Sequence, residues 1–275
     1  MRALIDADVL TYKCGFAAQK NVYHVSLDGT YLGAMEGAKE LKAELESLGE
    51  GATYEKEVVA EDVSHALHNV RTAIDRTTEN TGCRDYTLIL SGSGNFRLEE
   101  DSTLPYKGNR DELHKPVHYG AIKDYIYNCH PCEVANEMEG DDLMGIRQME
   151  NLGQTIICSI DKDMLMIPGH HYNLDKETIV EQSLHQANVA FYMQLVTGDR
   201  TDNIPGLKGM GPVRAANFLN SMHRRDWWKA IDELYMQQYN DPWVIWEQAR
   251  LLWILRYEHE MNTPPQWDQL FGDAL

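Results

Sequence analysis

The sequence lacks three features that would each define a class of protein. Its apolar runs are far too short to cross a bilayer, so we expect no membrane-spanning segment. Its N-terminus enters an apolar run at residues 3–5 without the layout of a signal peptide. Its five cysteines, an odd number in a chain of 275 residues, do not indicate a disulfide framework. These absences predict a protein of a reducing cytoplasm that has no membrane partner.

Basic residues are scarce as well. The chain has 25 lysines and arginines against 43 aspartates and glutamates, which gives a net charge of −18. Most nucleic-acid-binding proteins are basic, so this charge counts against a general nucleic-acid binder. Binding to DNA would require a local basic strip and bound cations on an otherwise repelling surface. The simpler alternative is that the acidity only keeps the protein soluble.

What the chain has in excess is acids at close spacing. Seven carboxylates stand in three short segments: Glu139, Asp141 and Asp142, then Asp161 and Asp163, then Asp199 and Asp202. Carboxylates that are brought together repel one another unless protons or cations intervene. Ligand sets made only of oxygen atoms suit hard cations such as Mg²⁺ or Mn²⁺. The most economical interpretation is a two-metal site that cuts phosphodiester bonds, with its metals ~4 Å apart.

Predicted strands would bring these acids together. Residues 1–9 predict a buried strand that ends at Asp6 or Asp8, and residues 86–90 predict a second strand. Residues 154–160 predict a third, which delivers Asp161 and Asp163 at its carboxyl end. Ligand groups in open parallel sheets lie just past the carboxyl ends of strands, so Asp6 is expected to join the acids. The alternative for Asp6 is an ordinary aspartate in a turn.

Helical spacing adds the flanking layers. Residues 143–152 predict a helix with Asp141 and Asp142 near its N-terminus, where capping could explain one aspartate but not three acids in four positions. Helices are also expected over residues 61–77 and 115–128, and residues 22–59 are expected to form a small inserted subdomain. We therefore predict an α/β catalytic domain over residues 1–185 and a helical DNA-binding domain over residues 186–275.

A glycine-containing turn stands between two predicted helices, residues 187–196 and 213–219. Gly209 and Gly211 allow backbone amides to approach a ligand closely, and Pro212 suits the first position of a helix. Bare N–H groups at a helix N-terminus form a ready phosphate site, which would hold a nucleic-acid backbone without reading its sequence. The residues expected to contact DNA are Arg97, Lys208, Gly209, Gly211 and Arg214.

Three further patterns are weaker. Lys107 and Arg110 lie three residues apart and could grip one phosphate, although surface cations are the default interpretation. Residues 129–132 have the spacing of a zinc-binding cysteine pair, but without a second pair we expect a strand with incidental thiols. Trp246 and Trp253 follow helical spacing, and core packing is favoured over a base-stacking surface.

In combination these motifs resemble the 5′-nuclease family: flap endonucleases, phage 5′–3′ exonucleases and the 5′-nuclease domain of bacterial DNA polymerase I. The resemblance covers most of the chain and is weakest over residues 15–80. The segments that carry it are Leu4-Ile-Asp6, Phe96-Arg-Leu-Glu99, Tyr106-Lys-Gly-Asn-Arg110, Glu139-Gly-Asp-Asp142, Ser159-Ile-Asp-Lys-Asp163 and the stretch from Gly198 to Gly211. The amino-acid sequences of several motifs resemble those of bacteriophage exonucleases.

The resemblance implies a mostly parallel, PIN-like sheet flanked by helices, with a C-terminal helix–three-turn–helix element that holds duplex DNA. It implies that two Mg²⁺, or Mn²⁺ in their place, are held or oriented by Asp6, Glu139, Asp141, Asp142, Asp161, Asp163, Asp199 and Asp202. It further implies that Lys107 and Arg110 steer the scissile phosphate, that Tyr106 positions the unpaired nucleotide, and that a K⁺ sits at the glycine hairpin.

The implied activity is that of a 5′–3′ exonuclease or flap endonuclease acting in phage DNA replication or degradation in the host cytoplasm. Its partner would be DNA with a 5′ end, flap or nick, or an RNA–DNA hybrid.

One departure from the family pattern matters. The family usually has an aspartate at the end of the strand before the Phe-Arg motif, whereas this strand ends Leu90-Ser91-Gly92. One metal-site carboxylate is therefore expected to be missing. This leaves open an alternative, a catalytically weakened protein that binds DNA structures without cutting them. An acidic scaffold or DNA mimic, which would bind no divalent cation, is a third interpretation.

Overall fold

The computed structural model describes residues 1–109 and 114–271, and these divide into two compact units. Unit 1 holds residues 1–8, 77–109 and 130–271. Unit 2 holds residues 9–76 and 114–129. Arg110, one of the two cations predicted to steer a phosphate, lies outside the described residues.

The centre of unit 1 is a six-stranded sheet. Its strands are β1 (Arg2–Asp6), β5 (Asp85–Ser91), β6 (Cys132–Ala135), β7 (Thr155–Ser159), β8 (Gly169–Asn173) and β9 (Thr178–Gln182). They lie in the order β6-β5-β1-β7-β8-β9, and every neighbouring pair is parallel except β8 and β9. The apolar residues of β1, β5 and β7 are buried, as expected for parallel strands covered on both faces. The carboxyl ends of these three strands therefore meet at one edge of the sheet.

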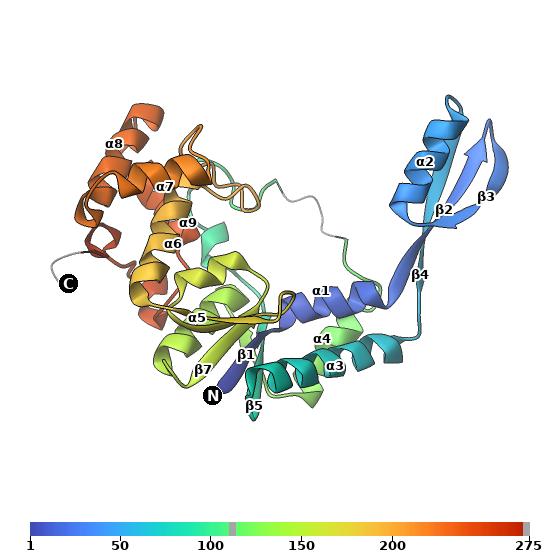
Figure 1. Cartoon of the computed structure of the whole chain (residues 1–275), viewed down its shortest axis with the longest axis horizontal. Helices are drawn as coiled ribbons and strands as arrows, with labels where there is room; N and C mark the ends of the chain where they lie inside the picture. The colour runs from blue at the N-terminus through green and yellow to red at the C-terminus, as the bar shows by residue number, and fades with distance from the viewer. Residues whose placement is uncertain (110–113, 272–275) are drawn as a thin grey trace. The chain divides into compact units, whose positions relative to one another are not determined.

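Helices complete unit 1. They are α5 (Gly140–Glu150), which packs against β1, β5 and β7, then α6 (Leu184–Thr197), α7 (Pro212–Asn220), α8 (Trp227–Tyr239) and α9 (Val244–Leu252) (Figure 1). Short 3₁₀ turns lie at Phe96–Leu98, Lys162–Met166, Arg224–Asp226, Glu258–Met261 and Trp267–Gln269. One hydrophobic core joins Leu4 and Ile157 of the sheet to Leu195 and Trp253 of the helical region. Because that core is shared, the boundary predicted near residue 185 falls inside unit 1.

Unit 2 contains the expected insertion. Its elements are α1 (Ala7–Ala17), β2 (Gln19–Leu27), β3 (Thr30–Glu36), α2 (Ala38–Leu48), β4 (Ala52–Ala60), α3 (Val63–Thr81) and α4 (Tyr119–Cys129); the first residues of α1 and the last of α3 belong to unit 1. The strands form an antiparallel sheet in the order β3-β2-β4, and Leu41 of α2 packs against Tyr23 and Val25. The hairpin turn predicted at Asp28 and Gly29 is present, with both residues at positive φ.

Several local predictions need correction. The first strand ends at Asp6, and α1 begins at the next residue, so residues 7–9 are helical. The helix predicted from residue 115 begins at Tyr119 because Pro116 precedes it. Strand β9 was not predicted at all. His171 lies in β8 and is buried, with its Nε2 2.7 Å from the Ile167 carbonyl oxygen.

The predictions for the cysteines and tryptophans agree with the structure. All five cysteines are free thiols, and Cys132 begins strand β6. Trp253 is buried in the core of unit 1, with Trp246 packed against that core, which confirms the packing interpretation. Within the described residues, no helix combines the length and the apolar character that crossing a membrane requires.

Candidate active site at the edge of the sheet

The carboxyl ends of β1 and β7 bring acids from distant parts of the chain together. Asp6 is the last residue of β1 and is buried, and its Oδ2 accepts a hydrogen bond from the Ser159 hydroxyl at 2.7 Å. Ser159 ends β7, and its Oγ also accepts from the Asp161 N–H at 3.0 Å. Asp161 in turn caps the turn that follows, accepting from the Asp163 N–H at 2.8 Å. One strand-end serine therefore connects Asp6 to the Asp161 segment.

The N-terminus of α5 brings a second group of acids to this edge. The pKa of Asp141 is raised well above its usual value, first by burial and then by the charges of Asp6, Asp161 and Glu139. Burial also opposes ionisation of Glu139, but the cations of Arg97 and Lys107 outweigh it and hold the pKa of this carboxyl low. The two acids are two residues apart, yet only Glu139 has its charge balanced by the protein.

A third group joins through α6. Asp163 is raised in pKa to about 7, first by burial and then by the neighbouring charge of Asp161. Asp199 is buried, and its Oδ2 accepts from the Gln194 amide at 2.9 Å. Burial alone would raise the pKa of Asp199, but the N–H groups of Thr201 and its neighbour, which donate to this carboxylate, lower it. Asp161 therefore acts electrostatically on both Asp141 and Asp163 and lies between two parts of the cluster.

The segment around Lys107 lies against these acids. The Tyr106 hydroxyl lies 2.9 Å from Glu139 Oε2 and 3.0 Å from Asp202 Oδ2, and Lys107 Nζ forms an ion pair with Glu139 Oε1. Lys107 adopts a φ of 56°, which is uncommon for a residue other than glycine and marks a constrained backbone. Its N–H donates to the Asp202 carbonyl oxygen at 2.9 Å. Tyr106, Lys107, Glu139 and Asp202 thus form one connected group.

Two of the predicted site residues have a different role. Arg97 is 2% exposed and donates bidentately to Asp142, which is fully buried, with distances of 2.6 and 2.8 Å. Arg97 also donates to the Leu251 and Trp253 carbonyl oxygens, and Asp142 also accepts from the Leu255 N–H. In this structure Arg97 and Asp142 are therefore partners of each other inside the protein. The contact of Arg97 with DNA and the metal role of Asp142 stay predictions, and this pairing favours neither.

The strand that lacks the expected aspartate has an acid beside its end. The Ser91 N–H donates to Asp8 Oδ2 at 2.8 Å, and the Ser91 hydroxyl accepts from the Gly140 N–H at 2.9 Å. A Cβ at Gly92 would lie 2.4 Å from the Ala135 carbonyl oxygen, so that position has no room for an aspartate. The carboxylate at the end of β5 therefore comes from the first turn of α1.

The donor set fits divalent cations. The gathered ligands are carboxylates, which suit Mg²⁺ or Mn²⁺, and the raised pKa values of Asp141 and Asp163 show negative charge that the protein leaves unbalanced. The arrangement is loose, however. Within residues 1–109 and 114–271, no three acid, histidine or cysteine side chains are drawn close enough to enclose a metal ion. The agreement with divalent cations therefore lies in the type of ligand and not in a completed coordination shell.

Comparisons with known proteins find relatives that match part of the chain. The chain is 31% identical over 130 residues to DNA polymerase I of Rhizobium leguminosarum, which is 42% of this chain and 13% of the polymerase. It is 28% identical over 116 residues to the flap endonuclease Xni of Shewanella frigidimarina, which is 37% of this chain and 45% of that enzyme. The matched part is thus less than half the length of either relative. No family model matches the chain.

Solved structures show the fold. A bacteriophage T5 flap endonuclease in a complex with DNA and metal ions matches with a TM-score of 0.53 and 15% identity, over 75% of this chain and 85% of that one. A T5 protein co-crystallised with metal ions gives a TM-score of 0.52 and 16% identity, over 75% and 87% of the two chains. In sequence the chain is thus similar to parts of a DNA polymerase I and a flap endonuclease, and in fold it is similar to 5′-nuclease structures. The expected α/β fold with a C-terminal helical region is confirmed.

The glycine hairpin lies between α6 and α7. Gly209 has a φ of 78°, a conformation that favours glycine, and its carbonyl oxygen accepts from the Arg214 guanidinium at 3.0 Å. Gly211 caps α7 without a side-chain hydrogen bond, and Pro212 occupies the first position of the helix. Lys208 is exposed, while its N–H donates to Gln238. The hairpin therefore carries two cations, Lys208 and Arg214, beside a helix start that no side chain caps.

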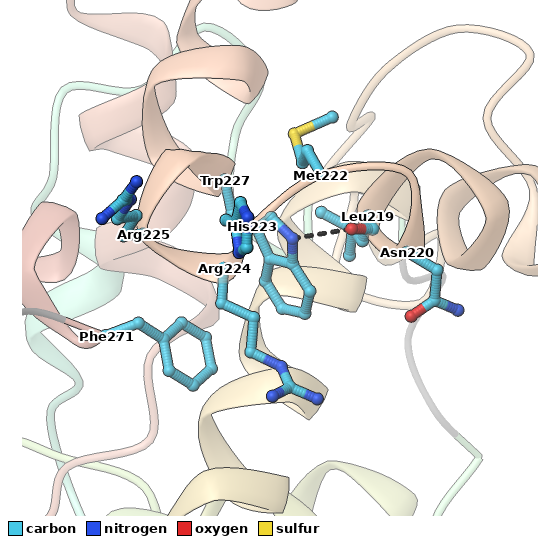
Figure 2. A pocket seen from close by; sticks show the side chains of 8 residues that line it. All are labelled: Leu219, Asn220, Met222, His223, Arg224, Arg225, Trp227 and Phe271. Carbon is cyan, nitrogen blue, oxygen red and sulfur yellow. Dashed lines mark hydrogen bonds between the residues drawn. The ribbon is translucent and has the colours of Figure 1, made fainter. Parts of the chain in front are cut away.

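A basic pocket lies at the other end of α7 (Figure 2). It has a volume of about 430 Å³, and its lining includes His223, Arg224 and Arg225. The Trp227 indole donates to the Leu219 carbonyl oxygen at 2.7 Å and fixes one wall, as the dashed line in Figure 2 shows. Neither arginine forms an ion pair with any residue that the structure describes. On a chain of net charge −18, this is a local cationic surface.

Sequence reasoning missed several residues of the site. Asp8 was noted only as one possible end of the first strand. The run His223-Arg224-Arg225 was a usable signal, because three successive cationic or titratable side chains are unusual in so acidic a chain. Ser159 and Gln194 carried no signal, since a strand-end serine and a mid-helix glutamine are ordinary.

Proposed function

We propose that the protein is a divalent-metal-dependent nuclease that hydrolyses phosphodiester bonds of DNA at 5′ ends, flaps or nicks, as a 5′–3′ exonuclease or flap endonuclease. The observation that supports this most is the gathering of acids from β1, α5, β7 and α6 beside Lys107, in a chain whose fold is similar to that of 5′-nuclease structures. The residues proposed to hold two Mg²⁺, or Mn²⁺, are Asp6, Glu139, Asp141, Asp161, Asp163, Asp199 and Asp202. When bound, such cations would acidify an attacking water and offset charge on the phosphate.

Lys107 and Tyr106 have separable proposed roles. In the present arrangement the Lys107 ammonium neutralises Glu139, and it lies 3.9 Å from Asp202 Oδ2. A scissile phosphate at this place would compete for the same ammonium, which would then stabilise the charge that develops on the phosphate oxygens. Burial and the adjacent Glu139 raise the pKa of Tyr106, so its hydroxyl stays protonated and acts as a hydrogen-bond donor. It positions a carboxylate or an unpaired nucleotide, and Arg110 is proposed to assist Lys107.

Duplex DNA is proposed to bind along α7. Lys208, Gly209, Gly211 and Arg214 would hold one stretch of phosphates at the N-terminal end of this helix, with K⁺ as a bridging ion at the hairpin. Arg224 and Arg225 would meet a second stretch at its other end, ~13 Å away at 1.5 Å per residue over nine residues. Contacts of this kind position DNA without reading sequence, which suits recognition by structure. Action in phage DNA replication or degradation in a host cytoplasm is part of this proposal.

The test is a cleavage panel of blunt, nicked, 5′-flapped and RNA–DNA substrates in Mg²⁺ and in Mn²⁺. The wild-type protein should cut at least one substrate with a free 5′ end, and Asp161→Asn and Asp163→Asn should abolish cutting while duplex binding survives. Asp85→Asn is the matched control, because Asp85 begins β5 at the opposite edge of the same sheet. Cleavage by Asp163→Asn at the wild-type rate would contradict the assigned site.

A catalytically weakened DNA-binding protein is the second candidate. One observation favours it, namely that β5 itself ends without an acid. This candidate predicts tight binding to flapped DNA with no cleavage in either metal. Cleavage by the wild-type chain and by Asp8→Asn separates the two candidates. If the protein is a nuclease that uses Asp8, the wild-type chain cuts in Mg²⁺, and Asp8→Asn loses this cutting but still binds duplex DNA.

A further inference from the structure

A second pocket lies within unit 2, far in sequence from the acid motifs. It has a volume of about 400 Å³ and is formed where the inserted strands leave α1. The residues that line it are Phe16, Gln19, Asn21, Lys56, Val58, His114, Lys115 and Val117. Strand β2 starts just after α1 and β4 returns to α3, and the Glu61 N–H donates to the Ala18 carbonyl oxygen to close the base of this ribbon (Figure 1).

The floor of the pocket is firmly built. The Val117 N–H donates to Gln19 Oε1 at 2.8 Å, which ties the segment before α4 to the first residue of β2. Pro116 packs so closely on α1 that a Cβ at Gly15 would lie 2.5 Å from its Cγ. Asn21 and Val58 are direct cross-strand partners, so their side chains share one face of the ribbon. The pocket is thus a feature of the fold, supported by contacts from four elements.

The pocket exposes aromatic and apolar side chains to solvent. Phe16 is 45% exposed and Val117 is 57% exposed, although both are large apolar residues. Phe16 continues an aromatic row, with its ring centroid 6.1 Å from that of Tyr12, which lies 5.4 Å from that of Tyr119. An exposed ring at the end of such a row offers a stacking face to a planar ligand.

Cations surround this apolar surface. Lys56 and Lys115 line the pocket together with His114, and Lys115 Nζ lies 5.0 Å from the centroid of Tyr119. Neither lysine forms an ion pair with any described residue. Two acids of the same ribbon already have partners, since Glu57 pairs with His24 and Glu36 with Lys20. The pocket therefore offers positive charge in a chain that is acidic overall.

We propose that this pocket binds an unpaired nucleic-acid strand, with a base stacked on Phe16 and flanking phosphates held by Lys56 and Lys115. Stacking on an aromatic ring combined with backbone cations is the way in which single strands are bound without sequence preference. The amides of Gln19 and Asn21 line the same space and can meet base edges. The inference rests on the proposed function only in taking nucleic acid as the ligand. It gives unit 2, which carries none of the acid motifs 139–142, 161–163 and 199–202, a role in binding the single strand of a flap.

The test measures binding of the full chain to a fluorescent oligothymidylate by anisotropy, in chelator so that nothing is cut. Phe16→Ala should weaken binding about tenfold, since stacking on one base contributes an effect of this order. Phe16→Tyr keeps the ring and should keep the affinity. The double variant Lys56→Ala, Lys115→Ala should lower the slope of log affinity against log salt concentration by about 1.4. Each phosphate contact to a single strand contributes roughly 0.7 to that slope. Affinity for blunt duplex should stay unchanged in all of these variants.

The matched controls are Tyr31→Ala, an exposed aromatic residue on β3, and Lys39→Ala, an exposed lysine on α2. Equal single-strand affinity in Phe16→Ala and Tyr31→Ala would overturn the proposal, as would a wild-type chain that does not bind the oligonucleotide. Displacement of the oligonucleotide by equimolar thymidine monophosphate would also overturn it, in favour of a free-nucleotide site. If the chain fails to cut DNA but shows the predicted binding pattern, the nuclease proposal is contradicted and the single-strand proposal stands.

Discussion

The acid cluster of unit 1 has two halves that differ in how their charge is balanced. In one half, Arg97 and Lys107 neutralise Asp142 and Glu139, and the pKa of Glu139 is held low. In the other half, Asp141 and Asp163 are half-buried, and partial burial together with neighbouring acids raises their pKa values. The first half is completed by the protein itself. The second holds charge that only protons or added cations can offset.

This difference shows why acids at adjacent positions cannot be assigned one role. Asp141 and Asp142 are neighbours in the first turn of α5, but successive helical residues point about 100° apart. Asp142 therefore turns inward to Arg97, while Asp141 turns toward Asp6 and Asp161. The balanced half fixes the start of α5, and the unbalanced half is left for a ligand.

The largest expected effect is the loss of stability in Arg97→Ala, which removes an ion pair from the balanced half. Arg97→Ala would leave the carboxylate of Asp142 buried without its cation, which should cost about 3–5 kcal/mol of unfolding free energy. Urea unfolding followed by circular dichroism measures this. Arg147→Ala is the control, because Arg147 pairs with Glu133 and Glu150 at the surface and its loss should cost about 1 kcal/mol or less. Similar losses in the two variants would refute the structural role of Arg97.

The variant Lys107→Ala tests whether the balanced half also contributes to cleavage. Lys107→Ala should slow single-turnover cleavage of a 5′-flap substrate on the order of 10²-fold, because a positioned charge at the developing oxyanion is lost. Flap binding should change little. Lys176→Ala, an exposed lysine after β8, should cut at the wild-type rate. A Lys107→Ala enzyme with an unchanged rate would confine this lysine to neutralising Glu139.

The unbalanced half predicts a dependence of stability on pH. Asp163 has a pKa raised from 3.8 to about 7 in the folded chain, so the folded state binds its proton more tightly than the unfolded state. Its stabilising contribution is complete below the unfolded pKa and is lost as pH rises through about 7. In chelator, the unfolding free energy should therefore fall by at most about 1.4 kcal/mol per pH unit from this group.

Asp163→Asn should flatten that fall, and Mg²⁺ at pH 8 should stabilise the wild-type protein more than the variant. Thermal unfolding across pH 5 to 8 with and without Mg²⁺ provides the measurement. Parallel curves for the two proteins would contradict the raised pKa of Asp163.

The smallest expected effect concerns the cationic surface around α7. Arg224→Ala with Arg225→Ala should lower the slope of log affinity for duplex DNA against log salt by about 1.8, at roughly 0.9 per phosphate contact. Affinity at a single salt concentration should fall only severalfold, equally for all sequences. A slope that stays at the wild-type value would remove this pocket from the DNA surface.

The sequence predicted the central strands because their apolar runs and strand-end acids are local patterns. Residues 154–160 identified β7, and the acids after it were placed correctly at the carboxyl edge. The pairing of Arg97 with Asp142 was not predictable, since the residues are 45 positions apart and burial alone distinguishes this arginine from one that binds DNA. Asp8 at the end of β5 was missed for the same reason, because its partner Ser91 is 83 positions away.

The most direct test of the account is a calorimetric titration of Mn²⁺ into the wild-type chain and into Asp161→Asn, at pH 8 without DNA. The charge of Asp161 helps to raise the pKa values of both Asp141 and Asp163, so its loss should weaken any cation site that either of them helps to form. We expect the wild-type chain to bind Mn²⁺ and Asp161→Asn to lose at least one ion, with Asp85→Asn unchanged. Identical titration curves for the wild-type chain and Asp161→Asn would contradict the claim that the unbalanced acids form a metal site.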